Sequence, residues 1–142
     1  DPLWSRGLGD VYKRQDFTLA YAFTDAQISR SNAGDQGQAV AGAPRHTASA
    51  WLSHRFAAQG RGGWVVGAGV RYTGSQWTGT SAITTPAATL ADAMVAYDAG
   101  DWRVAFNVVN LTDKVHITQC LARGDCFYGQ ARTYTLTSTY RF

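Results

Sequence analysis

Alternation of apolar and polar side chains, with a period of two residues, is the feature that most restricts the fold of this chain. In the last ten residues, TYTLTSTYRF, one parity holds mainly aromatic and aliphatic side chains and the other holds threonines and Arg141. Successive side chains of a β-strand point to opposite faces, so the pattern predicts a strand with one apolar and one polar face. Five earlier segments alternate in the same way, at residues 16–26, 45–56, 63–74, 89–99 and 101–111.

The composition also favours strands. All ten acidic residues are aspartate, and two of the 13 basic residues are lysine, so the charged residues that favour helices are scarce. Gly, Thr and Val are frequent and 13% of the residues are aromatic, which is typical of strands and turns. The 45–56 segment fits the alternation least well, because Trp51 falls on its polar parity and His54 on its apolar parity.

The connections between these segments alternate in length. Long loops are expected at residues 28–44, 75–87 and 112–131, and short turns at 57–62 and 99–100. The sequence therefore predicts an all-β, antiparallel, up-and-down meander with its long loops at one end. Each segment has roughly the 9–11 residues of a tilted strand that crosses a bilayer.

Aromatic residues on the apolar parity gather near both ends of the predicted strands. One group lies toward the short turns and a second toward the long loops. A soluble β-sandwich would alternate without two such belts, whereas outer-membrane barrels have them. The first group is Phe17, Phe56, Trp64, Tyr97, Trp102, Tyr140 and Phe142, and the second is Phe23, Tyr72 and Tyr134.

A lipid-facing sheet must close on itself, because lipid offers no hydrogen bonds to unpaired backbone groups. Six transmembrane strands are fewer than the smallest single-chain barrels of about 8. We therefore expect residues 16–142 to be the C-terminal part of a longer barrel chain. Residues 1–15 show neither alternation nor a helical period, and their last part, GLGDVYKRQ, resembles the sequence found at broken ends of genes predicted from environmental DNA. We therefore expect a non-native or disordered leader at residues 1–15.

Charge and hydropathy exclude other classes of protein. The net charge of +3 is scattered without a basic cluster, which argues against nucleic-acid binding. The sequence has no apolar run long enough for a transmembrane helix and no signal peptide at its start, so either the protein is cytosolic or this N-terminus is not the natural one. Cys120 and Cys126 are close enough for a small disulfide in an oxidising compartment. A metal site would need more ligands than these two and His116.

The C-terminal 36 residues resemble the end of TonB-dependent ferric-siderophore receptors, particularly the ferrichrome and hydroxamate type. The stretches PRHTASAWL, GAGVRYTGS and LADAMVAYD resemble the preceding strands of that family, so the resemblance covers residues 16–142. The matching C-terminal positions are Asn110, Leu111, Asp113 and Lys114; Cys120 and Cys126; Gly129 and Arg132; and Tyr140, Arg141 and Phe142.

The resemblance implies a 22-stranded barrel of the bacterial outer membrane, with an N-terminal plug and a TonB box that lie outside this chain. It implies a transport receptor rather than an enzyme, with no cofactor and with a ferric siderophore as cargo. Its partners would be the TonB complex, through the missing N-terminal region, the lipid bilayer and the outer-membrane assembly machinery. That machinery would read Tyr140 and Phe142 as the assembly signal.

Two aromatic stretches are candidate ligand contacts at the barrel mouth. Phe127 and Tyr128 follow the second cysteine, and Gln76 and Trp77 open the second long loop. Aromatic side chains at such a mouth could line a pocket for a ferric chelate, or could simply pack the loops. The disulfide would stiffen the last loop, and Arg55, Arg71 and Arg103 would face the lumen, where plug acids could pair with them.

Three other functions fit parts of the pattern. A passive porin would have the same strands without a plug, and a soluble β-sandwich would have them without a membrane. An outer-membrane barrel enzyme would need surface catalytic residues, and no serine, histidine and acid constellation is legible. Asp92 and Asp98 sit on the predicted lumen side, while Asp98 and Asp101 flank a tight turn, so neither pairing suggests acid–base catalysis.

Overall fold

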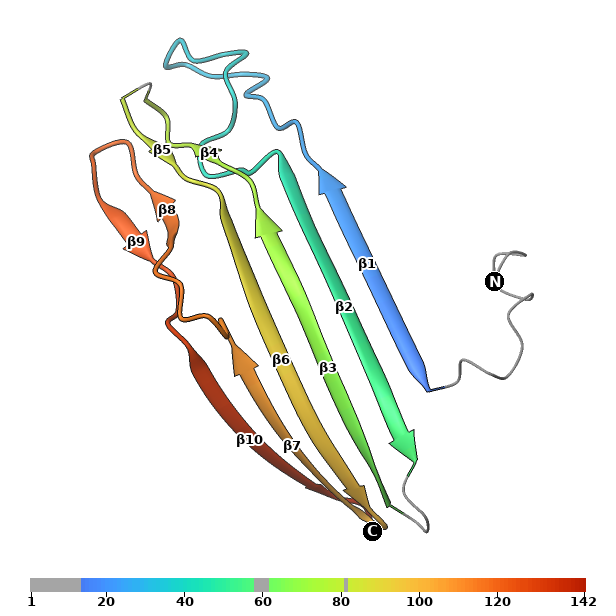
Figure 1. Ribbon diagram of the computed structural model, residues 1–142. Coiled ribbons are helices and arrows are strands. Elements are labelled where there is room, and N and C mark those ends of the chain that lie inside the picture. The colour runs from blue at the N-terminus through green and yellow to red at the C-terminus, as the bar shows by residue number, and fades with distance from the viewer. Residues whose placement is uncertain (1–13, 58–61, 81) are drawn as a thin grey trace, which may run out of the picture.

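The protein is described here by a computed structural model that covers residues 14–57, 62–80 and 82–142. Its main element is a six-stranded antiparallel sheet in the order β1-β2-β3-β6-β7-β10 (Figure 1). The six predicted segments each form one of these strands, so the predicted meander is confirmed. The bounds are Gln15–Phe23 (β1), His46–Ala57 (β2), Gly62–Thr73 (β3), Ala88–Ala99 (β6), Trp102–Val109 (β7) and Thr133–Tyr140 (β10).

Three strands, β1, β7 and β10, end earlier than their alternation suggested. β1 stops at Phe23, and the next amide, that of Thr24, donates to the carbonyl of Arg45 at 2.9 Å, which closes the base of the first long loop. β7 stops at Val109 because Asn110 has a φ of 54°, in the left-handed region that a strand does not use. The predicted short turn at 57–62 lies mainly outside the described residues, as do residues 1–13 of the expected leader.

Two of the predicted loops contain small hairpins of their own. β4 (Gln76–Trp77) pairs with β5 (Thr84–Thr85), and β8 (Ile117–Cys120) pairs with β9 (Cys126–Tyr128). Strands of two to four residues are too short for a period of two to be recognised, which is why the sequence predicted loops here. None of the described residues forms a helix with the length and apolar composition needed to cross a membrane.

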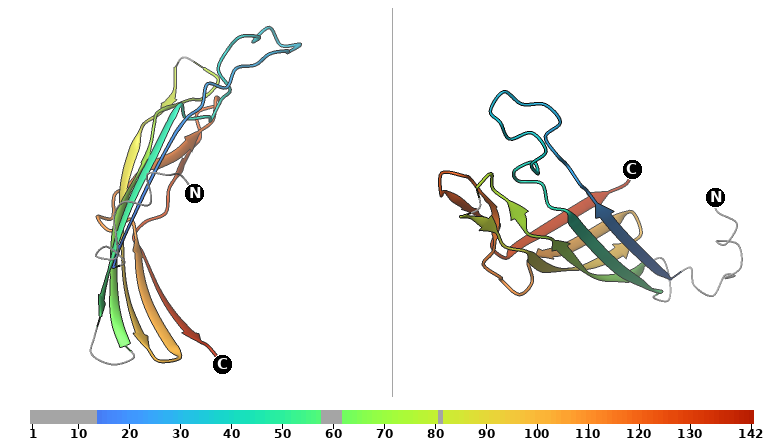
Figure 2. Two further views of the ribbon diagram at one scale, coloured as in Figure 1. Left: turned by 90° about the vertical axis from the view of Figure 1, so that its right-hand side faces the viewer. Right: turned by 90° about the horizontal axis from the view of Figure 1, so that it is seen from above.

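The main sheet is a single curved layer (Figure 2). Over the described residues, neither a helix nor a second sheet covers its apolar face, so the packing of a soluble β-sandwich is absent there. Large side chains on this face are strongly exposed, for example Leu19 at 68%, Trp64 at 50% and Leu136 at 71%. We call this side the aromatic face and the opposite side the polar face.

Over the residues that the structure describes, the main sheet is open at both edges. β1 pairs with β2 and β10 pairs with β7, so each of these outer strands has one neighbour in the main sheet. Unpaired strand edges present rows of backbone donors and acceptors that a lipid environment cannot satisfy. The strand count and the open edges therefore fit a section of a larger barrel.

The strand register shows how the aromatic side chains are arranged. Phe56, Trp64 and Tyr97 lie opposite one another on three successive strands, and the rings of Trp64 and Tyr97 are 4.8 Å apart. Phe17 and Tyr134, which we expected at opposite surfaces, lie in one row across the strands. Over five steps of about 4.8 Å, a strand tilt of about 40° would move that row by roughly 15 Å along the membrane normal. The two aromatic belts therefore lie at different heights in the membrane only if the strands are tilted from the membrane normal.

Trp51 lies on the polar face, where the alternation had left it as an exception. Its indole packs over Gly67 and Gly69 of β3, and a Cβ built on either glycine would come within 2.6 Å of the ring. Gly69 is the register partner of Trp51 and Gly67 is two residues away on the same face. The two glycines therefore make room for the large side chain of Trp51 on the polar face.

Candidate functional site

The three long connections lie at the same end of the sheet, because every second link of an antiparallel meander returns to the same side (Figure 1). Loop 1 is residues 24–45, loop 2 is residues 74–87 with β4 and β5, and loop 3 is residues 110–132 with β8 and β9. Together we call them the loop cluster. The link at the other end that the structure describes, residues 100–101, is a tight turn.

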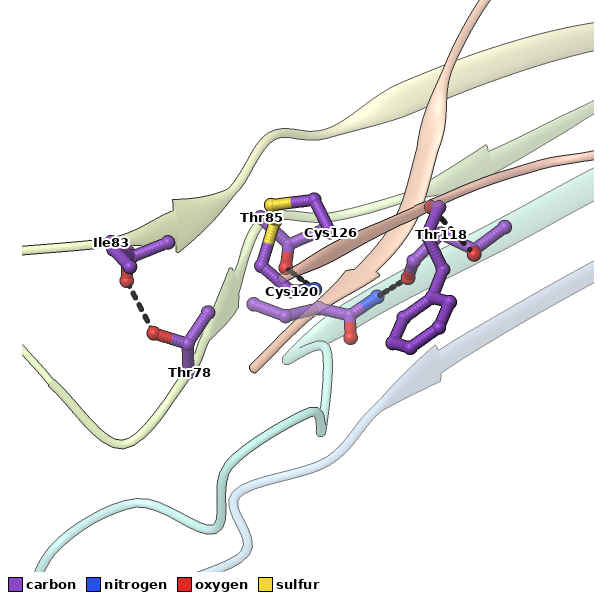
Figure 3. Close-up of a disulfide and its surroundings, with 8 residues drawn as sticks. Thr78, Ile83, Thr85, Thr118, Cys120 and Cys126 are labelled. Carbon is purple, nitrogen blue, oxygen red and sulfur yellow. Dashed lines mark hydrogen bonds between the residues drawn. A yellow bond between two sulfur atoms is a disulfide. The ribbon is translucent and has the colours of Figure 1, made fainter. Parts of the chain in front are cut away.

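A disulfide closes the hairpin of loop 3. Cys120 and Cys126 are register partners on β8 and β9, and their sulfur atoms are 2.01 Å apart (Figure 3). Between them, the amide of Leu121 donates to the carbonyl of Asp125 at 2.8 Å, and Gly124 adopts a φ of 106°. A covalent link and a tight turn therefore fix the tip of this hairpin.

The hairpin of loop 2 packs against the hairpin of loop 3. Thr85, which is 1% exposed, accepts a hydrogen bond at its Oγ1 from the amide of Cys120 at 2.9 Å (Figure 3). The amide Nε2 of Gln76 donates to the carbonyl of Thr118 at 3.3 Å. Within loop 2, the hydroxyl of Thr78 donates to the carbonyl of Ile83 at 2.6 Å. The bonds of Thr85 and Gln76 therefore join β5 and β4 to β8 at two points.

Loop 1 joins the cluster at Gly42. Its amide donates to the carbonyl of Trp77 at 2.8 Å, and its φ of 77° favours glycine. A Cβ at this position would come 3.0 Å from the side-chain nitrogen of Gln119 in loop 3. Gly42 therefore lies at the meeting point of all three loops.

Asn110 anchors the base of loop 3. Its side chain is fully buried, with Nδ2 donating to the carbonyls of Lys114 at 2.9 Å and Gln130 at 3.1 Å, and Oδ1 accepting from the amide of Lys114 at 2.9 Å. Its backbone amide donates to Asp92 of β6 at 3.0 Å. Asp92 also accepts two hydrogen bonds from Arg71 of β3, at 2.5 and 3.0 Å. The loop is thereby tied to an ion pair on the sheet.

Two cavities lie among these elements. One of about 240 Å³ lies between loops 1 and 2 and is lined by Thr24, Ala39, Arg45, Gln76 and Trp77 among others. A second of about 160 Å³ lies between the upper ends of β3 and β6 and the start of loop 3, and its lining includes Arg71, Gln76, Leu90 and His116. Both combine apolar walls with a few polar groups, as small-molecule sites do.

The structure places the expected ligand residues in two different situations. Gln76 is 8% exposed, its side-chain amide donates to the carbonyl of Thr118, and it lines both cavities, while Trp77 lines the larger one. Phe127 and Tyr128 lie on β9, 52% and 72% exposed, and line neither cavity. The two pairs are on neighbouring hairpins without forming one pocket.

The other expected residues lie elsewhere. Tyr140 ends β10 and Phe142 follows it at the turn end of the sheet, with their rings 6.4 Å apart. Arg55 and Arg103 both approach one carboxylate on the polar face, that of Asp98, at 2.8 and 3.3 Å.

Sequence reasoning missed part of the base of loop 3. It singled out Asn110, Asp113, Gly129 and Arg132 as motif residues without giving them a physical role. Asp113 accepts from the amide of Arg132 at 2.9 Å, and a Cβ on Gly129 would come 1.9 Å from Nε2 of His116. Asn110 and Asp113 carried a signal, since an asparagine and an aspartate at the end of a strand pattern commonly mark a turn.

Comparisons with a family model and with curated proteins match the chain to one class of receptor. The family model described as "TonB dependent receptor-like, beta-barrel" matches residues 4–111. The chain is 33% identical over 129 residues to the ferrioxamine B receptor of Salmonella typhimurium strain LT2. The aligned region covers 87% of this chain and 18% of that protein. It is 33% identical over 130 residues to the ferrichrome outer membrane transporter/phage receptor of Escherichia coli K12, covering 87% and 17%.

Solved structures agree on the fold. The chain superposes on the closed form of the ferric-catecholate import receptor Fiu of E. coli K12 with a TM-score of 0.74 and 26% identity, over 94% of this chain and 20% of that one. The ferripyoverdine receptor of Pseudomonas aeruginosa shares the fold at 20% identity and a TM-score of 0.70, over 93% and 18%. The chain thus spans about a fifth of the length of the proteins that it matches.

Proposed function

Because the chain belongs to the TonB-dependent receptor β-barrel family, which is a family of the bacterial outer membrane, we propose that it forms part of the wall of a receptor for ferric siderophores. The observation that carries this proposal is the exposed aromatic face of a single open sheet that bears three connected loops at one end. Lipid covers the aromatic face, further strands complete the barrel at both edges, and the loops face the outside of the cell.

In this receptor, residues 16–142 belong to the C-terminal barrel section, and the wall already begins at Gln15, where β1 starts one residue inside the expected leader. The loop cluster contributes to capture of the chelate, with Phe127 and Tyr128 offering exposed aromatic surface and Trp77 lining a cavity. Gln76 acts instead through its bond to Thr118, which holds two hairpins together. Tyr140 and Phe142 serve as the signal for the outer-membrane assembly machinery.

Transport takes its energy from the TonB complex, through a region of the receptor outside this chain. The named relatives are a ferrioxamine B receptor and a ferrichrome transporter, which supports a ferric chelate as cargo and transport without a catalysed reaction. The sheet supplies a wall, and the loop cluster supplies a part of the mouth.

Uptake of radioactive iron tests this function. The receptor that contains this chain would be expressed in a bacterial strain that lacks its own siderophore receptors, with ferric chelates as the sole iron source. We expect saturable uptake that stops when TonB is deleted. Uptake that continues without TonB would indicate a passive porin, and absence of uptake with every chelate would contradict the proposal.

A further inference from the structure

Loop 3 begins where the regular pairing of β6 with β7 stops. The last register partners of these two strands at the loop end are Ala93 and Val108. Beyond them the φ of 54° at Asn110 interrupts the ladder, because a strand does not use the left-handed region. The amide of Leu111 still donates to the carbonyl of Ala91, at 2.7 Å. The amide of Asn110, a fully buried residue, needs an acceptor of another kind.

Asp92 supplies that acceptor from the polar face. Its Oδ1 lies 3.0 Å from the amide nitrogen of Asn110 and 3.0 Å from Nη2 of Arg71, and its Oδ2 lies 2.5 Å from Nε of Arg71. Two parallel bonds from one guanidinium fix the orientation of a carboxylate as well as its position. Arg71 therefore orients the carboxylate that holds the base of loop 3.

The side chain of Asn110 extends this constraint into the loop. It donates to the carbonyl of Lys114 near the start of loop 3 and to that of Gln130 near its end, at 2.9 and 3.1 Å. Between these two points lies the disulfide hairpin, on which Phe127 and Tyr128 are exposed. A shift of Asn110 would therefore move both arms of loop 3, and the two aromatic side chains with them.

Asp98 is a second carboxylate on the same strand and the same face, but without a bond to a loop. It accepts from Arg55 of β2 at 2.8 Å and from Arg103 of β7 at 3.3 Å, near the turn end of the sheet. Both aspartates thus join β6 to other strands through arginine, whereas Asp92 also accepts from a loop amide. Stabilisation of the sheet alone would not require that additional bond.

We infer that Asp92 is a positioning residue for chelate capture: oriented by Arg71, it sets the place at which loop 3 presents Phe127 and Tyr128. This inference rests on the proposed receptor function. Asp92 acts through Asn110 rather than by touching the chelate, so its loss weakens capture and leaves the later steps of transport unchanged.

The test compares Asp92→Ala with Asp98→Ala in the receptor that contains this chain. Uptake of radioactive iron would be measured as a function of concentration for a ferric tris-hydroxamate and for a ferric tris-catecholate chelate. With each chelate that the wild type takes up, we expect Asp92→Ala to raise the concentration for half-maximal uptake about tenfold, because a buried amide loses a charged acceptor. The maximal rate should change by less than about twofold, and Asp98→Ala should leave both quantities within about twofold of the wild type.

Asp92→Asn separates the hydrogen bond from the charge. Its side-chain oxygen can still accept from the amide of Asn110, so we expect the concentration for half-maximal uptake to rise only about threefold. Amide hydrogen exchange without chelate reports the position of the loop directly. Exchange at Asn110 and Leu111 should be fastest in Asp92→Ala, intermediate in Asp92→Asn and unchanged in Asp98→Ala.

Two results would overturn the inference and leave the receptor function intact. One is an equal concentration for half-maximal uptake in Asp92→Ala and Asp98→Ala, and the other is a loss confined to the maximal rate. Should Asp92→Ala fail to assemble, Asp92→Asn decides, and half-maximal uptake and loop exchange equal to those of the wild type would overturn the inference. A wild-type receptor that takes up neither chelate would overturn the receptor function itself.

Discussion

The main sheet and the loop cluster are held together in different ways. In the sheet every inner strand pairs with two neighbours along most of its length, and its aromatic face is covered by nothing among the described residues. In the loop cluster the strands have two to four residues, and single bonds such as those of Gln76 and Thr85 join one hairpin to the next. The main sheet is therefore held by many equivalent backbone pairs and by the medium that covers its aromatic face, whereas the loop cluster is held by the bonds of individual residues.

The largest expected effect comes from placing a charge on the aromatic face. Leu136 and Thr137 are neighbours on β10 that point to opposite faces, and both are exposed. If lipid covers the aromatic face, Leu136→Arg should destabilise the folded receptor by about 2–4 kcal/mol, as arginine does near the middle of a bilayer. Urea titration of receptor folded into lipid vesicles would measure it.

Thr137→Arg is the matched control, because it adds the same side chain one residue away on the polar face. We expect a change of less than about 1 kcal/mol for it, as is usual for surface substitutions away from special features. Equal effects of the two variants would mean that water or protein, rather than lipid, covers the aromatic face.

The sheet could be predicted from sequence because its signal is repeated. Six segments carried the same alternation, so a local exception such as Trp51 did not obscure the strand that contains it. The physical reason for that exception, a pair of glycines on the next strand, depends on register and could not be read from one segment alone. The extent of the six strands was predicted to within a few residues.

The loop cluster was predicted much less completely. The cysteine pair was visible in the sequence, but the partner of Cys120 in loop 2, Thr85, lies 35 residues away, with nothing in its neighbourhood to mark it. Gln76 was chosen as a ligand contact because it opens a loop, and the structure uses its amide to join two hairpins. Bonds between loops follow from how the sheet brings them together, so no local pattern encodes them.

Removal of the disulfide should loosen the loop cluster and leave the sheet intact. With Cys120→Ser and Cys126→Ser together, the loss of loop-closure entropy for so short a ring is worth about 2–3 kcal/mol at most. We expect faster amide hydrogen exchange in β8 and β9 and unchanged exchange in β3 and β6. Loss of protection in the sheet as well would show that the main sheet and the loop cluster fold as one unit and are not held together separately.

A smaller effect is expected from Thr85→Val, which keeps the shape of the side chain but removes the acceptor of the Cys120 amide. Thr85 is almost completely buried, so the amide loses its partner where water does not reach it easily, at a cost of about 1–2 kcal/mol. Thr84→Val, on the exposed neighbour, is the control and should change little. Hydrogen exchange at the Cys120 amide reports the difference, and equal exchange in the two variants would argue against this bond.

The smallest effect is expected from Gln76→Ala. It removes one hydrogen bond of 3.3 Å, with a long donor–acceptor distance, so the expected loss is about 0.5–1 kcal/mol. The acceptor, the carbonyl of Thr118, belongs to β8, whose exposed neighbours give water access to it.

Chelate binding separates the two roles considered for Gln76, a link between two hairpins and a direct ligand contact. If Gln76 acts through Thr118, then Gln76→Ala and Thr85→Val should weaken binding together by less than the sum of their separate effects, because both release the same hairpin. Strictly additive effects, with a large loss from Gln76→Ala alone, would return Gln76 to the role of a direct ligand contact.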